Sequence, residues 1–403
     1  MLKTIRLEFQ KLYAFALVYM ISFVALLNLI NSLLNMVGVQ TVLDTLALYG
    51  MLFGLLFVGL LVAIADRRGM KIDIIAVVGI FVLLYAFSYA LHPENRRYLV
   101  TNFLDYAGNP LYLVFLYSLP AYVFVRKLTD YAYFQKLLIQ SSYIIVLMSI
   151  TIFLFGGNVH GRQYMTFSYN MLLPLLVLYF HKPKRWQWIY RIFLVFSIFI
   201  FSIGGARGAL VSFFAVIVLY NFVTMRLDKK TIMQLMVMTV AVGLFSVFKD
   251  QILSYMLDIL DLFSIRSRTL EYIRQDQFLD DSYRFEIYLT ALEKISVLGH
   301  GMRGDRVFFS GSYTHNIFIE LWMDFGWIFG TLISALLLTV IFKGVKNKHA
   351  PEHFYAFLFL STGFFALLLS GSYLNQTPAF FALLGFCVNS IVRKKEQKNG
   401  LVS

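Results

Sequence analysis

The sequence predicts an all-α integral membrane protein that crosses the bilayer about twelve times, with one large extracytoplasmic loop between the ninth and tenth spans. The chain of 403 residues is 59% hydrophobic and 14% charged, and its mean hydropathy is +0.72. A soluble chain of this length needs more polar surface than this. The chain also contains about twelve apolar runs near the ~20 residues that a membrane-spanning helix requires. Basic residues cluster in the short loops between the runs, as in membrane proteins.

The apolar runs follow one another along the whole chain. The first exceeds a signal-peptide core and lacks a small-residue cleavage site, so we expect it to be retained as a span. We expect residues 1–403 to form a single membrane domain, in which residues 249–313 form the extracytoplasmic loop and contain short helices. The predicted spans are 12–37, 45–65, 72–91, 110–125, 137–155, 164–180, 189–203, 208–223, 231–248, 316–342, 354–370 and 376–392.

The distribution of basic residues predicts the orientation of the chain. Both termini and the loops on the same side contain 23 of the 35 Lys and Arg residues. The short loops on the opposite side contain four. Short cytoplasmic loops of membrane proteins are enriched in Lys and Arg, and long loops contribute little to this bias. We therefore expect both termini in the cytoplasm and residues 249–313 outside it. Anchoring residues account for the formal net charge of +13, so no nucleic-acid partner is expected.

The cysteine and metal-ligand content argues against a disulfide-bonded protein and against a metalloprotein. The single cysteine, Cys387, lies in the last apolar run, which excludes an intramolecular disulfide framework and indicates a small packing residue. The sequence has no Asp-x-Asp motif and no His or Cys cluster with the spacing of metal ligands. We therefore expect neither a metal nor a cofactor.

The predicted extracytoplasmic loop is the most polar part of the chain and leads into a span with polar residues of its own. Residues 251–263 place apolar side chains on one helical face and are predicted to lie flat in the membrane interface. Residues 283–298 repeat this pattern and predict a second short helix. Residues 314–316 (T-H-N) open the tenth span, where Glu320 and Asp324 share one helix face. Ionisable groups at such positions indicate a functional site by default.

Three motifs in a fixed order resemble those of a known family. The first two are T-F-S-Y-N from Thr166 and G-A-R-G-A-L from Gly205. The third combines R-F-E-I-Y-x2-A-L from Arg284, G-H-G at 299–301, and T-H-N-x-F-I-E-x4-F-G-x3-G from Thr314. Together they resemble the O-antigen ligase and polymerase superfamily of bacterial membrane glycosyltransferases. This sequence departs from the family pattern in having Tyr where Trp is usual, four residues after the arginine, and His inside the G-x-G.

The resemblance implies a helical fold with an active site between the outer span ends and the long loop. The donor would be a polyprenyl-diphosphate-linked oligosaccharide in the outer leaflet of the bacterial cytoplasmic (inner) membrane. Its glycan would be transferred onto a sugar hydroxyl of another lipid-linked repeat unit, with lipid diphosphate as the leaving group. Flippase and chain-length regulator proteins are expected partners. The expected enzyme is a metal-independent glycosyltransferase, most simply a repeat-unit polymerase for a capsule, O-antigen or similar surface glycan.

Residues on the predicted outer side suit this chemistry. Arginine carries a fixed charge and a planar fork that matches a diphosphate, so Arg207 and Arg284 are expected to stabilise the leaving group. A neutral imidazole can accept a proton near pH 7, which makes His315 the expected general base. Further candidates for binding substrate or orienting the base are Arg162, Arg303, Asn316 and Asp324.

Other interpretations stay open at this point. Arg207 at a span end is typical of a snorkelling anchor, and Thr314, His315 or Asn316 could cap the following helix. The two acids of the tenth span could hydrogen-bond inside the helix bundle. For the whole chain, the alternatives are a ligase that transfers finished glycan to a different acceptor, and a transporter or flippase. Transporters often have two related halves, and this sequence shows no internal repeat.

Overall fold

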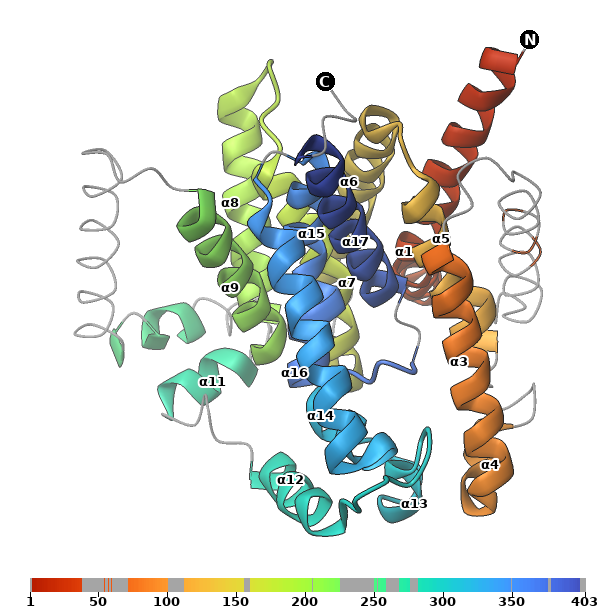
Figure 1. The fold of residues 1–403 in the computed structure, drawn as a ribbon. Helices are drawn as coiled ribbons and strands as arrows, with labels where there is room; N and C mark the ends of the chain where they lie inside the picture. Colours follow the sequence, from red (N-terminus) through yellow and green to blue (C-terminus); the bar gives the residue numbers. More distant parts are fainter. Residues whose placement is uncertain are drawn as a thin grey trace. The chain divides into compact units, whose positions relative to one another are not determined.

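The described part of the chain consists of helices joined by turns and irregular connections. The structure is a computed structural model, and it contains no strand among the residues that it describes (Figure 1). This confirms the all-α class that the composition predicts. The described residues are 2–37, 54, 57, 59, 72–100, 112–155, 160–204, 206–224, 250–251, 253–258, 268–275, 282–348, 350–375 and 378–398.

Seven described helical segments are long and apolar enough to cross a membrane. They fall on seven of the predicted spans, so the polytopic membrane character is confirmed at this level. The seven are Glu8–Met36 in α1 (Leu2–Met36), α3 (Ile72–Leu91), α6 (Tyr131–Phe155), α8 (Gln187–Gly204), α9 (Arg207–Thr224), α14 (Ile317–Lys346), and Pro351–Leu369, which joins α15 (Pro351–Leu360), η3 (Ser361–Phe365) and α16 (Ala366–Leu369).

Three other predicted spans are helical but do not belong to this set. The run 110–125 contains η2 (Tyr112–Ser118) and the start of α5 (Leu119–Lys127). The run 164–180 lies in α7 (His160–Phe180), and 376–392 lies largely in α17 (Pro378–Lys398). The predicted spans 45–65 and 231–248 lie outside the described residues, apart from 54, 57 and 59. Shorter helices are η1 (Pro93–Asn95), α4 (Arg96–Leu99), α11 (Arg268–Arg274), α12 (Ser282–Lys294) and α13 (Asp305–Phe308).

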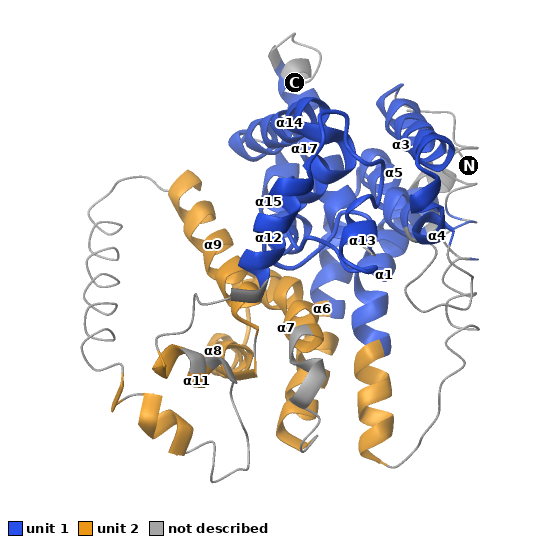
Figure 2. Ribbon diagram, turned by 90° about the horizontal axis from the view of Figure 1, so that it is seen from below, with its two compact units in different colours: residues 1–27, 41–141, 281–403 blue, residues 28–40, 142–280 orange. Residues whose placement is uncertain are grey.

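The chain divides into two compact units, which Figure 2 colours separately. Unit 1 comprises residues 1–27, 41–141 and 281–403. Within it, α17 packs against α5, α14 and α15. Gly344 of α14 lies directly against Cys387 of α17, where any side chain on the glycine would collide with the cysteine. Cys387 is fully buried there and is a packing residue, as its position in the sequence predicts.

Unit 2 comprises residues 28–40 and 142–280. In this unit α7 packs against α8 and α9. The break between α8 and α9 is held by Ser168 of α7, whose hydroxyl accepts a hydrogen bond from the amide of Ala206. Gly204, at the end of α8, lies against the rings of Phe153 and Phe167. The end of α8 and the start of α9 therefore both lie against α7.

The predicted extracytoplasmic segment 249–313 contains short helices, as expected. The described residues 253–258 are helical, and α12 covers most of the second predicted helix, 283–298. The boundary between the two units falls inside this segment, between Asp280 and Asp281. Its second half, with α12 and α13, belongs to the same unit as α14.

Candidate functional site

Helix α14 begins immediately after the T-H-N triplet, and Asn316 is its N-cap. The side-chain Oδ1 of Asn316 accepts hydrogen bonds from the amides of Phe318 (3.0 Å) and Ile319 (3.3 Å). These amides lack intrahelical partners, so the cap stabilises the first turn. The Nδ2 group of Asn316 also donates to the carbonyl of Leu368 at 3.1 Å. Among the three residues considered as caps, the structure selects Asn316.

His315 has an unusual backbone conformation next to this cap. Its φ is 57°, in the left-handed region that few residues other than glycine adopt, although histidine is among the more tolerant. Its Nδ1 lies 3.3 Å from the carbonyl oxygen of Ser370, and its ring lies 4.2 Å from that of Tyr313, centre to centre. A carbonyl only accepts hydrogen bonds, so a neutral imidazole at this contact carries its proton on Nδ1. The lone pair is then on Nε2.

Two further side chains contact residues 369 and 370 in the same stretch of backbone. Arg284 of α12 donates from Nη1 to the carbonyl of Leu369, and its Nη2 lies 3.5 Å from the hydroxyl of Ser370. The hydroxyl of Tyr313 donates to the carbonyl of Ser370 at 3.1 Å. Burial, together with the Glu320 carboxylate, raises the pKa of Tyr313, so this phenol stays protonated as a donor at neutral pH.

These contacts define one cluster at the end of α16, which we name the 368–370 turn. The last carbonyls of a helix have no partners within the helix, so they attract donors such as Arg and His. The sequence separates the donors widely, yet the fold brings them to one turn. Its contributors are Arg284, Tyr313, His315 and Asn316, and three of these four are predicted site residues.

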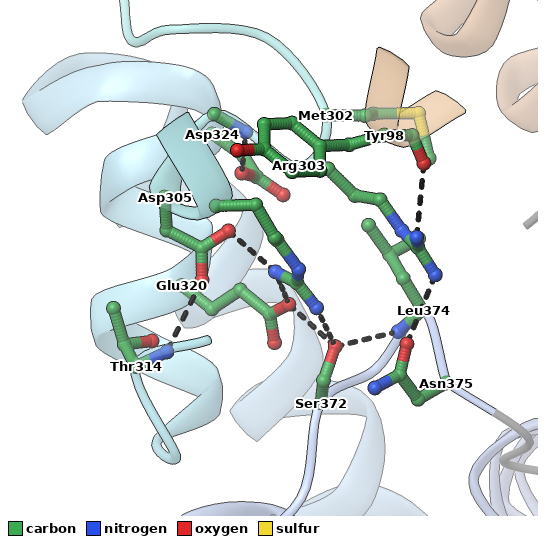
Figure 3. A network of polar contacts seen from close by, with 12 residues as sticks. Tyr98, Met302, Arg303, Asp305, Thr314, Glu320, Asp324, Ser372, Leu374 and Asn375 are labelled. Carbon is green, nitrogen blue, oxygen red and sulfur yellow. Dashed lines mark hydrogen bonds and ion pairs between the residues drawn. The ribbon is translucent and has the colours of Figure 1, made fainter. Parts of the chain in front are cut away.

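A buried ionic network lies in the same unit and includes the two acids of α14 (Figure 3). Arg306 of α13 is bracketed by Asp305 and by Glu320, whose Oε1 is 2.6 Å from Nη1. Arg306 also donates to Ser372 at 2.7 Å, and Glu320 accepts from the amide of Tyr373 at 3.2 Å. Burial alone would lower the pKa of Arg306, but Asp305 and Glu320 more than offset this and raise it, so the guanidinium stays charged.

Asp324 and Arg303, both expected to bind substrate, are members of this buried region. The carboxylate of Asp324 accepts from the amide of Gly304 at 3.1 Å and from the hydroxyl of Tyr373 at 2.7 Å. Arg303 donates to the carbonyl of Tyr98 at 2.9 Å and to the Oδ1 atom of Asn375 at 3.0 Å. Burial lowers the pKa of Arg303 to about 10, and the nearby charged Arg306 contributes to this. Both acids of α14 are therefore hydrogen-bonded inside unit 1.

The glycine-rich turn of residues 299–301 binds to a kink in α14. The amide of Gly301 donates to the carbonyl of Asp324 at 2.8 Å, and that of His300 donates to the carbonyl of Met323 at 2.9 Å. Gly299 and Gly326 both have positive φ, 82° and 75°, and a Cβ on either would overlap backbone atoms of the other segment. The two glycine motifs of the sequence are thus the two halves of one backbone contact.

The remaining predicted arginines belong to unit 2. Arg207 is the first residue of α9 and is half-buried, and Arg162 lies in α7 with its side chain outside the described residues. In unit 1, sequence reasoning missed Tyr313, Arg306 and the polar stretch Ser370–Tyr373. The only signals for them were adjacency to the T-H-N triplet, an Asp-Arg pair in the polar loop, and a break in the apolar pattern after the eleventh predicted span.

The described residues contain no group of three or more His, Cys, Asp or Glu side chains that could hold a metal ion. Comparison of the chain with protein-family models, with curated proteins and with solved structures finds no match in any of the three. The chemistry of the 368–370 turn and the sequence motifs are therefore the basis for a functional assignment.

Proposed function

We propose that the protein is a repeat-unit polymerase for a bacterial surface polysaccharide, such as a capsule or an O-antigen. The observation that carries this proposal is the meeting of Arg284 and His315 at the 368–370 turn. The two residues come from different parts of the motif that resembles the O-antigen ligase and polymerase superfamily. A fixed cation and a neutral imidazole beside one another suit the transfer of a glycan from a diphosphate.

The proposed enzyme crosses the cytoplasmic membrane twelve times, with both termini in the cytoplasm. The charge asymmetry of the loops supports this orientation. With this orientation, the 368–370 turn lies at the outer face of the cytoplasmic membrane, where a flippase delivers lipid-linked repeat units. The donor and the acceptor are both polyprenyl-diphosphate-linked glycans, and a chain-length regulator is the natural further partner.

In the proposed reaction, a hydroxyl oxygen of the acceptor sugar forms a bond to the anomeric carbon of the donor. The bond between that carbon and the diphosphate oxygen breaks, and polyprenyl diphosphate leaves with the electron pair. His315 accepts the hydroxyl proton on Nε2 while Nδ1–H is held by the carbonyl of Ser370. Arg284 neutralises the charge that develops on the diphosphate. The roles of Arg207 and Arg162 stay predictions from the sequence.

The buried network has a supporting role in this proposal. Ser372 and Tyr373 lie just after the 368–370 turn, beyond Gly371, and both are hydrogen-bonded to Glu320. Arg303 donates a hydrogen bond to Asn375, which lies further along the segment that follows α16. A site built on a connection between helices needs such support to keep its geometry. We therefore assign Arg303 and Asp324 to positioning the site, and Asn316 to orienting the backbone that carries His315.

The substitution His315→Asn tests the proposal. Asparagine tolerates the left-handed conformation of residue 315 but accepts no proton at neutral pH. A lost general base lowers the rate by ~10²–10⁴-fold, so we expect polymer to disappear while membrane abundance stays normal. Single lipid-linked repeat units should accumulate, measured by extracting and sizing the lipid-linked glycans.

The matched control is His92→Asn. His92 is predicted to lie on the same side of the membrane as His315, and its ring contacts Glu94 rather than the 368–370 turn. This variant should make polymer of normal length. Long chains stranded on the lipid carrier in His315→Asn would identify a ligase instead. Normal polymer in His315→Asn would refute His315 as the base, and with it the proposed mechanism.

A further inference from the structure

Helix α12 has a buried face and a separate apolar face that the protein leaves exposed. Ile287 and Ala291 are 6% and 0% exposed, on the side that packs against α14. Phe285, Leu289 and Leu292 are 62%, 47% and 39% exposed. The spacing i, i+4, i+7 places these three side chains on a single stripe of the helix. The stripe is therefore not part of the core of unit 1.

The rest of the exposed surface of α12 is polar. Glu286, Thr290 and Glu293 are all exposed, and the 100° spacing of helical residues gathers them on a third face beside the apolar stripe. A surface helix in a soluble environment has one polar outer face. A helix with distinct apolar and polar outer faces is typical of one that lies in a membrane interface.

The apolar stripe continues into the surface of a membrane-spanning helix. Val297 and Leu298, just beyond α12, are exposed. The carbonyl of the preceding residue, Ser296, accepts a hydrogen bond from the amide of Trp327 at 3.2 Å, which joins this segment to α14. From Trp327 onward α14 exposes apolar side chains such as Leu332, as expected of a span that faces lipid. In Figure 1 α12 lies across the end of α14 rather than along it.

We propose that α12 lies in the outer interface of the membrane, with Phe285, Leu289 and Leu292 in contact with lipid acyl chains. The polar face that includes Thr290 and Glu293 then faces water. A tryptophan at the junction with α14 fits this depth, because Trp is enriched where a span enters the headgroup region.

This placement has a consequence for Arg284, which rests on the proposed function. Arg284 precedes Phe285 and reaches the 368–370 turn from the buried side of α12. An interfacial α12 holds this guanidinium at the depth of the lipid headgroups. The diphosphate of a polyprenyl-linked donor occupies the same depth, so the substrate can reach Arg284 by lateral diffusion, without its polyprenyl chain leaving the bilayer.

Nitroxide spin labels on two adjacent residues test the placement of α12. Leu289→Cys and Thr290→Cys put a label on the apolar stripe and on the polar face of the same helix turn. The native Cys387 is fully buried, and protein without a new cysteine supplies the blank. The full chain is reconstituted in vesicles of phosphatidylethanolamine and phosphatidylglycerol, and relaxation by oxygen and by a water-soluble nickel chelate is measured. Oxygen concentrates in the bilayer, whereas the chelate stays in water.

We expect the oxygen-to-nickel relaxation ratio to be several-fold higher at 289 than at 290. Equal ratios, or a label at 289 that the nickel chelate reaches freely, would place the stripe in water and overturn the inference. A label at 289 that neither reagent reaches would show that protein covers the stripe and would also overturn it. The measurement needs no substrate or turnover, so a failed polymer assay leaves its outcome unaffected.

Discussion

The 368–370 turn and the buried ionic network are neighbours in the chain but differ in how the protein satisfies their charges. In the network, Arg306 is in contact with two carboxylates and a hydroxyl, and its side chain is 3% exposed. At the turn, Arg284 and His315 are half-buried, and both lie against backbone carbonyls of residues 369 and 370. In the proposed function, the half-buried guanidinium of Arg284 binds the diphosphate anion. A cation neutralised inside the fold contributes to structure instead.

The largest expected effect follows from breaking the network. Arg306→Met leaves Asp305 and Glu320 buried without their cation, which typically costs ~3–5 kcal/mol. We expect a large fall in the thermal midpoint of the detergent-solubilised protein and in its membrane abundance. Both would be measured on epitope-tagged protein.

Two variants sharpen this comparison. Combining Arg306→Met with Asp305→Asn and Glu320→Gln removes the uncompensated charges and should recover much of the stability. Arg284→Lys, at the 368–370 turn, should leave the thermal midpoint close to that of the unmodified protein, because lysine keeps the charge at a half-buried position. Normal stability of Arg306→Met would contradict the assignment of the network to structure.

A smaller but still large effect is expected at the kink of α14. Gly326 has φ 75° and ψ 177°, a conformation that is essentially restricted to glycine, and an added Cβ would overlap the carbonyl of Val297. Backbone strain of this kind costs on the order of 1–3 kcal/mol before the overlap is counted. Gly326→Ala should therefore lower the thermal midpoint. It should also lower polymer yield, because the 299–301 turn can no longer pack against the kink of α14.

Gly79→Ala is the matched control for this prediction. Gly79 lies inside α3, with no described atom within 4 Å of the position of an added Cβ, and alanine favours helix over glycine. Its thermal midpoint should not fall. Equal behaviour of the two variants would mean that the contact between the glycine motifs contributes nothing to the fold.

The smallest effect concerns the cap of α14. Asn316→Ala removes the acceptor for two amides and should cost ~1 kcal/mol, seen as a small fall in the thermal midpoint. Asn316→Asp keeps the acceptor for the two amides, so the fall that comes from losing the cap should be absent. Any fall that it does show reports the lost donor to the carbonyl of Leu368. His315→Asn should leave the thermal midpoint unchanged as well. A larger fall in His315→Asn than in Asn316→Ala would show that the histidine, rather than the asparagine, stabilises this helix start.

The roles of neighbouring residues in the T-H-N triplet show where prediction from sequence stops. The motif points to residues 314–316 as a unit, and the cap preference of asparagine is a local property. Which of the three caps the helix depends on the backbone, and the left-handed conformation of His315 leaves Asn316 in the extended conformation that a cap requires. Residue types alone therefore could not predict where each side chain of the triplet points.

Sequence by itself determined the membrane character of this protein and most of its described helices, because hydropathy and helix length are properties of each segment taken alone. It also grouped Arg284, His315 and Asn316 through one motif. Only the tertiary structure decided that these residues meet at the end of α16, that Arg306 is neutralised by Glu320, and that Gly299 fits against Gly326. Such contacts join segments that are distant in the chain and have no periodic signature. The capacity of Asp324 to serve as a support likewise depends on Tyr373, which folding brings to it from beyond the next span.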